Sequence, residues 1–144
     1  LRHSSAASDV YKRQIYISLI WNSFERTLSR SDIVISMSGT AAEQAVGLAK
    51  PVIQIDGSGP QFTSSFANAQ RRLLGDYVFC ATKYKSSDEK IQETIDIIFR
   101  VMYLLKLDKN FLICCKKIAK SRLGSIGASL QISKDINDNL INGK

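Results

Sequence analysis

The chain has 144 residues, with 20 lysine or arginine side chains, 13 aspartate or glutamate side chains and a formal net charge of +7. This length supports one full hydrophobic core. No run of about eighteen uncharged apolar residues is present, which excludes a membrane-spanning helix, and no RNA- or DNA-binding motif accompanies the basic residues, so we expect no nucleic-acid partner. The three cysteines lack C-x-x-C spacing, and we interpret them as buried, reduced thiols.

Residues 1–14, LRHSSAASDVYKRQ, resemble a translated adaptor sequence and show no helical periodicity. We set them aside as a non-native leader and treat residues 15–144 as one domain. The leader contains His3, the only histidine of the chain. Residues 15–144 therefore cannot assemble a histidine-based triad, acid-base pair or zinc site, and we expect this domain to hold no metal and no cofactor.

The domain begins with a predicted strand and a short helix. The strand covers residues 15–20, and the helix carries Phe24 and Leu28 one turn apart. The run DIVIS, residues 32–36, has a β-branched stretch without charge from Ile33 to Ile35, the pattern of a strand that is buried on both faces of a parallel sheet. We expect this second strand to lead directly into the most informative segment.

A sharp turn at Ser38 and Gly39 follows the DIVIS strand. Thr40 is a suitable helix N-cap, and AAEQAVGLA supplies good helix formers as far as Pro51, which disfavours helix in the residue before it. The apolar run PVIQI then predicts another strand. Strand, turn, helix and strand thus follow one another in order.

The loop DGSGPQ follows PVIQI, and the next segment places Phe62, Phe66 and Leu73 on one face of a predicted helix. The resulting β-α-β-α order predicts a parallel pair of strands joined by a helical crossover. The turn at Ser38 and the DGSGPQ loop should then both open at the carboxyl edge of the sheet, where open α/β sheets bind ligands. We therefore predict a Rossmann-like α/β fold with a parallel sheet and flanking helices.

The remaining chain predicts a third strand at YVFCA and three further helices. The first helix, capped by Ser87 or Asp88, is apolar on most sides and should pack between the sheet and another element. Its main apolar stripe consists of Ile91, Ile95, Ile98, Met102 and Leu105, widened by Ile97, Val101 and Leu104. The second helix gathers Lys116, Lys117, Lys120 and Arg122 toward its end. Such a cluster is either a solvated face or a surface for anionic lipid. The RLGSIGAS segment then ends this helix and separates it from a terminal helix.

Ser38, Gly39 and Thr40 are the candidate phosphate-binding residues. Unpaired N–H groups at a helix N-terminus point outward, and the helix dipole adds partial positive charge there. Gly39 would let an anion approach the backbone. The same turn also occurs in α/β proteins for tight packing alone, so the sequence leaves both interpretations open.

Glu43 and Gln61 are the other candidate binding residues. Thr40 and Glu43 have the T-x-x-E spacing of a capping box, but a carboxylate in a first helical turn can instead accept hydrogen bonds from ribose hydroxyls. Gln61 places an amide above the same sheet edge. The other carboxylates near this edge, Asp56 and Asp76, have no carboxylate partner that the sequence reveals.

The segment SGTAAEQAVGLAKPVIQIDGSGPQFTSSFANAQRRLLG resembles the carboxyl-terminal half of GT-B glycosyltransferases, most closely cyanobacterial proteins related to lipid-A-disaccharide synthase. It also resembles the enzyme that adds N-acetylglucosamine to undecaprenyl-linked muramyl-pentapeptide. The resemblance implies that Ser38, Gly39 and Thr40 receive the donor diphosphate, that Glu43 binds the ribose and that Gln61 binds the sugar hydroxyls. Asn68 lies further from the glutamine than in the peptidoglycan enzyme, so helix packing is its expected role.

The resemblance implies that residues 15–144 are the donor-binding half of an enzyme that moves a hexose or N-acylhexosamine from a nucleoside diphosphate sugar, a UDP-sugar, to a lipid-linked or glycolipid acceptor. The acceptor and the catalytic base would belong to an amino-terminal domain absent from this chain, so the chain alone should transfer nothing. We expect a cytoplasmic protein, or one peripheral to the inner face of the membrane. A UDP-sugar 2-epimerase and a non-catalytic α/β interaction domain are the alternatives.

Overall fold

The computed structural model describes residues 16–57, 59, 63–81, 86–125 and 127–142. The three strands of this part form one parallel sheet in the order β1-β2-β3. The α/β class, the parallel sheet and the flanking helices are therefore confirmed, and the arrangement is compatible with a Rossmann-like fold. In chain order the elements are α2 (Phe24–Arg30), β1 (Val34–Ser36), α3 (Gly39–Gly47), β2 (Val52–Gln54), α4 (Ser64–Leu74), β3 (Val78–Phe79), α5 (Ser87–Leu107), α6 (Phe111–Leu123) and α7 (Ala128–Asn142).

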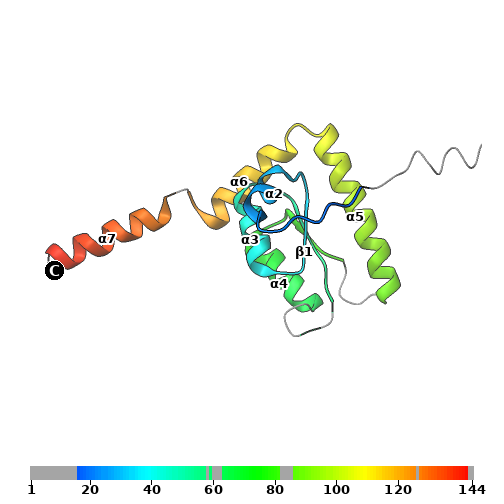
Figure 1. Cartoon of the computed structure of the whole chain (residues 1–144), viewed down its shortest axis with the longest axis horizontal. Coiled ribbons are helices and arrows are strands. Elements are labelled where there is room, and N and C mark those ends of the chain that lie inside the picture. Colours follow the sequence, from blue (N-terminus) through cyan, green and yellow to red (C-terminus); the bar gives the residue numbers. More distant parts are fainter. Residues whose placement is uncertain (1–15, 58, 60–62, 82–85, 126, 143–144) are drawn as a thin grey trace, which may run out of the picture.

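The central strand β2 is buried on both faces, and its alternating side chains build two hydrophobic clusters. Val52 belongs to the cluster formed with α2, α3, α4 and the end of α6. Ile53 belongs to the cluster formed with α5 and the beginning of α6. The sheet is thus covered on both faces, with α3 and α4 on one side of the strands and α5 on the other (Figure 1).

The predicted burial of both faces of the DIVIS strand is wrong for β1. Ile35 is 53% exposed, whereas the neighbouring Ser36 is buried. The reason is that β1 is an outer strand of the sheet, while α5 packs over the central strand β2. A β-branched run therefore formed a strand as predicted, but its position at the edge left one face open to solvent.

The predicted strand at residues 15–20 is also wrong for its described part. Residues 16–20 have no regular secondary structure, and Tyr16 and Ile17 are 87% and 85% exposed. A strand needs a hydrogen-bonded neighbour, and none of the described strands pairs with this segment. The following helix α2 forms as predicted, with Leu28 buried in the core.

Helix α4 begins at Ser64, after Thr63, whose hydroxyl accepts a hydrogen bond from the Phe66 N–H at 3.2 Å. Its buried face consists of Ala67, Gln70 and Leu74. The predicted face is therefore wrong at Leu73, which is exposed. The buried face is rotated by one residue, so that Ala67 and Leu74 are buried in place of the predicted Phe66 and Leu73. Phe62 lies outside the described residues.

Helix α5 is capped one residue earlier than predicted. The Ser86 hydroxyl accepts from the Glu89 N–H, and the Glu89 carboxylate accepts from the Ser86 N–H at 2.9 Å, so the two residues form a capping box in place of Ser87 or Asp88. Ile97 and Val101 are the buried positions of α5, whereas much of the predicted main stripe is exposed. The buried positions of α5 contact β2 and the beginning of α6, which agrees with the predicted packing between the sheet and another element. The buried surface of α5 is narrower than the predicted stripe.

The two carboxyl-terminal helices differ in their contacts. Helix α6 packs Phe111, Cys115 and Ala119 into the core and exposes its predicted basic cluster. Helix α7 extends away from the body of the domain (Figure 1), and its described apolar side chains, such as Ile136 and Leu140, are exposed. The predicted break between these helices is confirmed. None of the described helices combines the length and the hydropathy needed to cross a bilayer.

Candidate functional site

The turn after β1 is closed by a serine that the sequence interpretation did not single out. The Ser36 hydroxyl accepts a hydrogen bond from the Ser38 N–H at 3.0 Å and donates one to the Ser38 carbonyl at 2.9 Å. Ser38, and not Thr40, is the N-cap of α3, and its side chain makes no capping hydrogen bond. Serine and threonine are both favoured caps, so residue type alone could not place the helix start.

The first turn of α3 presents three unpaired donors at the carboxyl edge of the sheet. The helical hydrogen bonds begin with the Ala42 N–H, which donates to the Ser38 carbonyl at 3.2 Å. Within the described part of the chain, the N–H groups of Gly39, Thr40 and Ala41 have no hydrogen-bond partner. Together with the partial positive charge of a helix N-terminus, these groups can bind an anionic oxygen.

Glu43 is the fifth residue of α3, so it lies one turn beyond the helix start. The predicted capping box between Thr40 and Glu43 is therefore wrong, because a box requires the carboxylate at the third helical position. Glu43 is exposed and accepts no hydrogen bond from any described residue. Its carboxylate is available to a ligand on the surface of α3, and its role as a ribose-binding residue stays a prediction.

Gly39 also has a packing role. A Cβ atom on Gly39 would lie 3.2 Å from the Gln70 amide nitrogen and 3.2 Å from the Phe66 ring, both on α4. Gly39 therefore lets the start of α3 approach α4 closely, which gives this glycine a structural function whether or not a ligand binds. Asn68, on the same helix, donates to the Ser64 carbonyl at 2.8 Å and accepts from the Cys80 thiol at 3.6 Å, in agreement with its expected packing role.

A polar cluster joins the end of β2 to the first turns of α4 and α5. The Lys90 ammonium donates to the Asp56 carboxylate at 2.7 Å and to the Ser64 hydroxyl at 2.8 Å, and Ser64 itself donates to Asp56. Burial raises the pKa of Asp56, but the hydrogen bonds from Lys90 and Ser64 and the charge of Lys90 outweigh this effect and lower it. Beside the cluster lies an open hollow of about 550 Å³, lined in part by Ile91 and Ile95. Gln61 lies outside the described residues.

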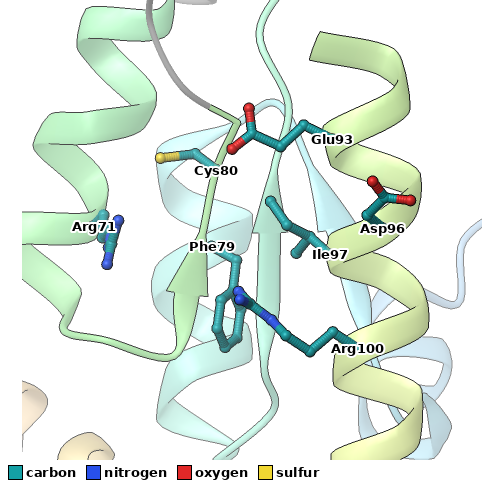
Figure 2. Close-up of a pocket in the computed structure, with 7 residues that line it drawn as sticks. All are labelled: Arg71, Phe79, Cys80, Glu93, Asp96, Ile97 and Arg100. Atoms are coloured by element: carbon teal, nitrogen blue, oxygen red, sulfur yellow. The ribbon is translucent and has the colours of Figure 1, made fainter. Parts of the chain in front are cut away.

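A second hollow, of about 420 Å³, lies between α4 and α5 at the carboxyl end of β3 (Figure 2). The Arg100 guanidinium is 5.7 Å from the centre of the Phe79 ring, a cation–π contact. Burial raises the pKa of the Cys80 thiol despite the opposing effect of Arg71, so Cys80 is a poor nucleophile at neutral pH. The lining residues are Arg71, Phe79, Cys80, Glu93, Asp96, Ile97 and Arg100.

The three cysteines are free, but only Cys115 is buried, because Cys80 and Cys114 are partly exposed. The prediction of buried thiols is therefore correct for one of them. No set of three histidine, cysteine, aspartate or glutamate side chains within the described ranges lies close enough to hold a metal ion.

The fold and the turn define an α/β domain with a parallel sheet and an unpaired helix N-terminus at the carboxyl edge of that sheet. Comparison of the chain with protein-family models, with curated proteins and with solved structures finds no match. The contacts of the site and the sequence resemblance are therefore the basis for a functional proposal.

Proposed function

We propose that this chain is the donor-binding domain of a glycosyltransferase of the GT-B type, and that it binds a nucleoside diphosphate sugar, a UDP-sugar, at the start of α3. The observation that carries this proposal is the set of unpaired N–H groups on Gly39, Thr40 and Ala41. They lie in the first turn of a helix that follows the end of a parallel strand, which is where open α/β sheets bind ligands.

The contribution of this domain to the reaction is electrostatic and positional. When the bond between the anomeric carbon and the β-phosphate oxygen breaks, negative charge grows on the departing nucleoside diphosphate. The N–H groups and the dipole of α3 stabilise that charge. Glu43 and Gln61 orient the ribose and the sugar.

The acceptor is a lipid-linked or glycolipid hydroxyl. Its oxygen bonds to the anomeric carbon, and its proton passes to a base that the resemblance assigns to a separate amino-terminal domain. The exposed basic cluster of α6 supports an encounter with anionic lipid.

Saturation-transfer NMR on the 144-residue chain with UDP-N-acetylglucosamine, UDP, ADP and GDP tests this proposal. We expect signals selective for the uridine nucleotides, and we expect Glu43→Ala to weaken them. Glu25→Ala, which removes another exposed helical carboxylate, is the matched control and should bind like the wild type. A folded wild-type chain that binds none of the four nucleotides would contradict the proposal.

One observation favours a second candidate, a non-catalytic α/β interaction domain. The close approach of Phe66 and Gln70 to Gly39 explains the glycine by packing alone. This candidate predicts no preference among the four nucleotides, and the same NMR experiment therefore separates the two functions.

A further inference from the structure

Two buried glutamines lie on the same side of the domain as the first turn of α3. Gln54, at the end of β2, is 2% exposed, and Gln70, on α4, is 8% exposed. Three of their polar atoms, both amide atoms of Gln54 and the amide oxygen of Gln70, are occluded from solvent and have no partner among the described residues. Buried polar groups are normally hydrogen-bonded, so these two side chains are exceptions within the described structure.

The Gln70 side chain is aimed at the start of α3. Its amide nitrogen lies 3.2 Å from the position that a Cβ atom would take on Gly39, the first residue of the helix. This nitrogen is not one of the occluded atoms, and no described residue accepts a hydrogen bond from it. An amide nitrogen carries two donor hydrogens. Gln70 therefore brings an unused, reachable donor to the place where the N–H groups of α3 are also unused.

We propose that the Gln70 amide is a ligand-binding donor of this site, hydrogen-bonding through Nε2 to the anionic diphosphate that the first turn of α3 receives. The assignment rests on the proposed function and adds a side chain from α4 to a site otherwise made of backbone groups. A ligand oxygen bound by Gly39, Thr40 and Gln70 would contact α3 and α4 together. It would also satisfy an amide donor on a residue that is only 8% exposed.

The effects of Gln70→Met on ligand affinity and on thermal stability together distinguish a ligand-binding role from a purely structural one. Gln70→Met keeps the length of the side chain and removes its polar atoms, including the occluded oxygen. Because that oxygen has no partner in the described structure, the variant should unfold at the same temperature as the wild type or at a higher one. A residue that served only packing would lose binding together with stability, whereas Gln70→Met should lose binding and keep stability.

The test is isothermal titration of the 144-residue chain with UDP, with inorganic pyrophosphate and with uridine, combined with thermal unfolding. For Gln70→Met we expect a Kd for UDP and for pyrophosphate about tenfold higher than that of the wild type, as the loss of one charge-assisted hydrogen bond implies. The Kd for uridine should not change. Gln70→Glu places a carboxylate against the diphosphate and should raise the Kd for UDP further at neutral pH.

Gln44→Met is the matched control, since Gln44 is exposed on α3 and bonds to no described side chain. It should leave both the Kd values and the unfolding temperature unchanged. If the wild type binds UDP and pyrophosphate and Gln70→Met binds them with equal affinity, the proposed role of Gln70 is wrong and the proposed function still stands. A folded wild type that binds neither UDP nor pyrophosphate would overturn both.

Discussion

Lys90, in the first turns of α5, forms an ion pair with Asp56, which follows the end of β2, with 2.7 Å between Nζ and Oδ2. The two residues are 34 positions apart in the sequence. Because Ser64 at the start of α4 bonds to both, the pair joins three elements at the carboxyl edge of the sheet. This edge is therefore held in place by polar contacts as well as by the hydrophobic core beneath it.

Asp56→Asn should lower the free energy of unfolding at pH 7 by about 1 kcal/mol, a value that allows for the partial exposure of the pair. The pKa of Asp56 is below its ordinary value of 3.8 in the folded protein. Its contribution is therefore fully present above the unfolded-state pKa and is lost as pH falls through the lower folded-state pKa. Urea unfolding from about pH 6 to about pH 2 should show the difference between wild type and variant shrinking over the acid part of this range.

Asp32→Asn is the control for this prediction, because Asp32 is exposed and bonds to no described residue. Asp32→Asn should lower the free energy of unfolding much less than Asp56→Asn does at neutral pH. Equal effects of the two substitutions would show that the ion pair with Lys90 does not stabilise the fold.

Ser86→Ala should lower the free energy of unfolding by about 1 kcal/mol, because it removes the N-cap of α5. The Ser86 hydroxyl bonds to the Glu89 carboxylate at 2.7 Å, and its N–H donates to the same oxygen. Ser87→Ala alters the neighbouring hydroxyl, which lies inside the helix and has no bond to a described residue, and should change stability by less than about 0.5 kcal/mol. Chemical denaturation of both variants would reveal the opposite order if Ser87 were the cap.

Gly75→Ala should be strongly destabilising. Gly75 has a φ of 101°, and a Cβ atom there would lie 2.7 Å from the Ile118 Cγ2 atom on α6. The left-handed backbone and the clash together should cost about 2 to 4 kcal/mol. Gly124→Ala has the same type of backbone cost, with a φ of 81°, but its Cβ atom would meet no atom of the described residues within 4 Å. Thermal unfolding should therefore place Gly124→Ala between the wild type and Gly75→Ala, and similar values for the two variants would contradict the close packing at Gly75.

Gln54→Met should leave the free energy of unfolding unchanged or raise it by about 1 to 2 kcal/mol, because it removes two buried polar atoms that have no partner in the described structure. Denaturation in urea gives the comparison. A loss of more than about 1 kcal/mol would mean that the Gln54 amide has a hydrogen-bond partner in the folded protein.

The sequence pattern predicted the core of the fold where local signals agreed. The apolar runs around Val52 and Val78 form the parallel strands β2 and β3 as predicted. Burial on both faces agrees with the apolar pattern at the central strand β2. The same reasoning fails at Ile35, because the sequence of one strand does not show whether that strand lies at the centre or at the edge of the sheet. It failed at residues 16–20 because a strand also requires a neighbour.

The sequence predicts the position of the turn before α3 but not the contacts around it, and the binding roles of Ser38, Gly39 and Thr40 stay predictions. The turn at Ser38 and Gly39 lies where the β-α-β order predicts it. The N-cap is Ser38 and not Thr40, so Glu43 lies two positions further into the helix than predicted, because several neighbouring polar residues are suitable caps. The sequence reveals no carboxylate partner for Asp56, and its partner in the structure, Lys90, comes from a distant helix. The sequence does not distinguish Gln70 from the other polar residues of α4, since an amide inside an amphipathic helix gives no local sign that it will be buried.

Binding of a nucleoside diphosphate at the first turn of α3 is tested most directly by a two-dimensional ¹⁵N–¹H NMR titration of the 144-residue chain with UDP. We predict that the backbone amide signals of Gly39, Thr40 and Ala41 shift progressively with UDP and with inorganic pyrophosphate and do not shift with uridine. Shifts confined to other residues, such as those lining the hollow between α4 and α5, or no shifts from a folded chain, would contradict nucleotide binding at the first turn of α3.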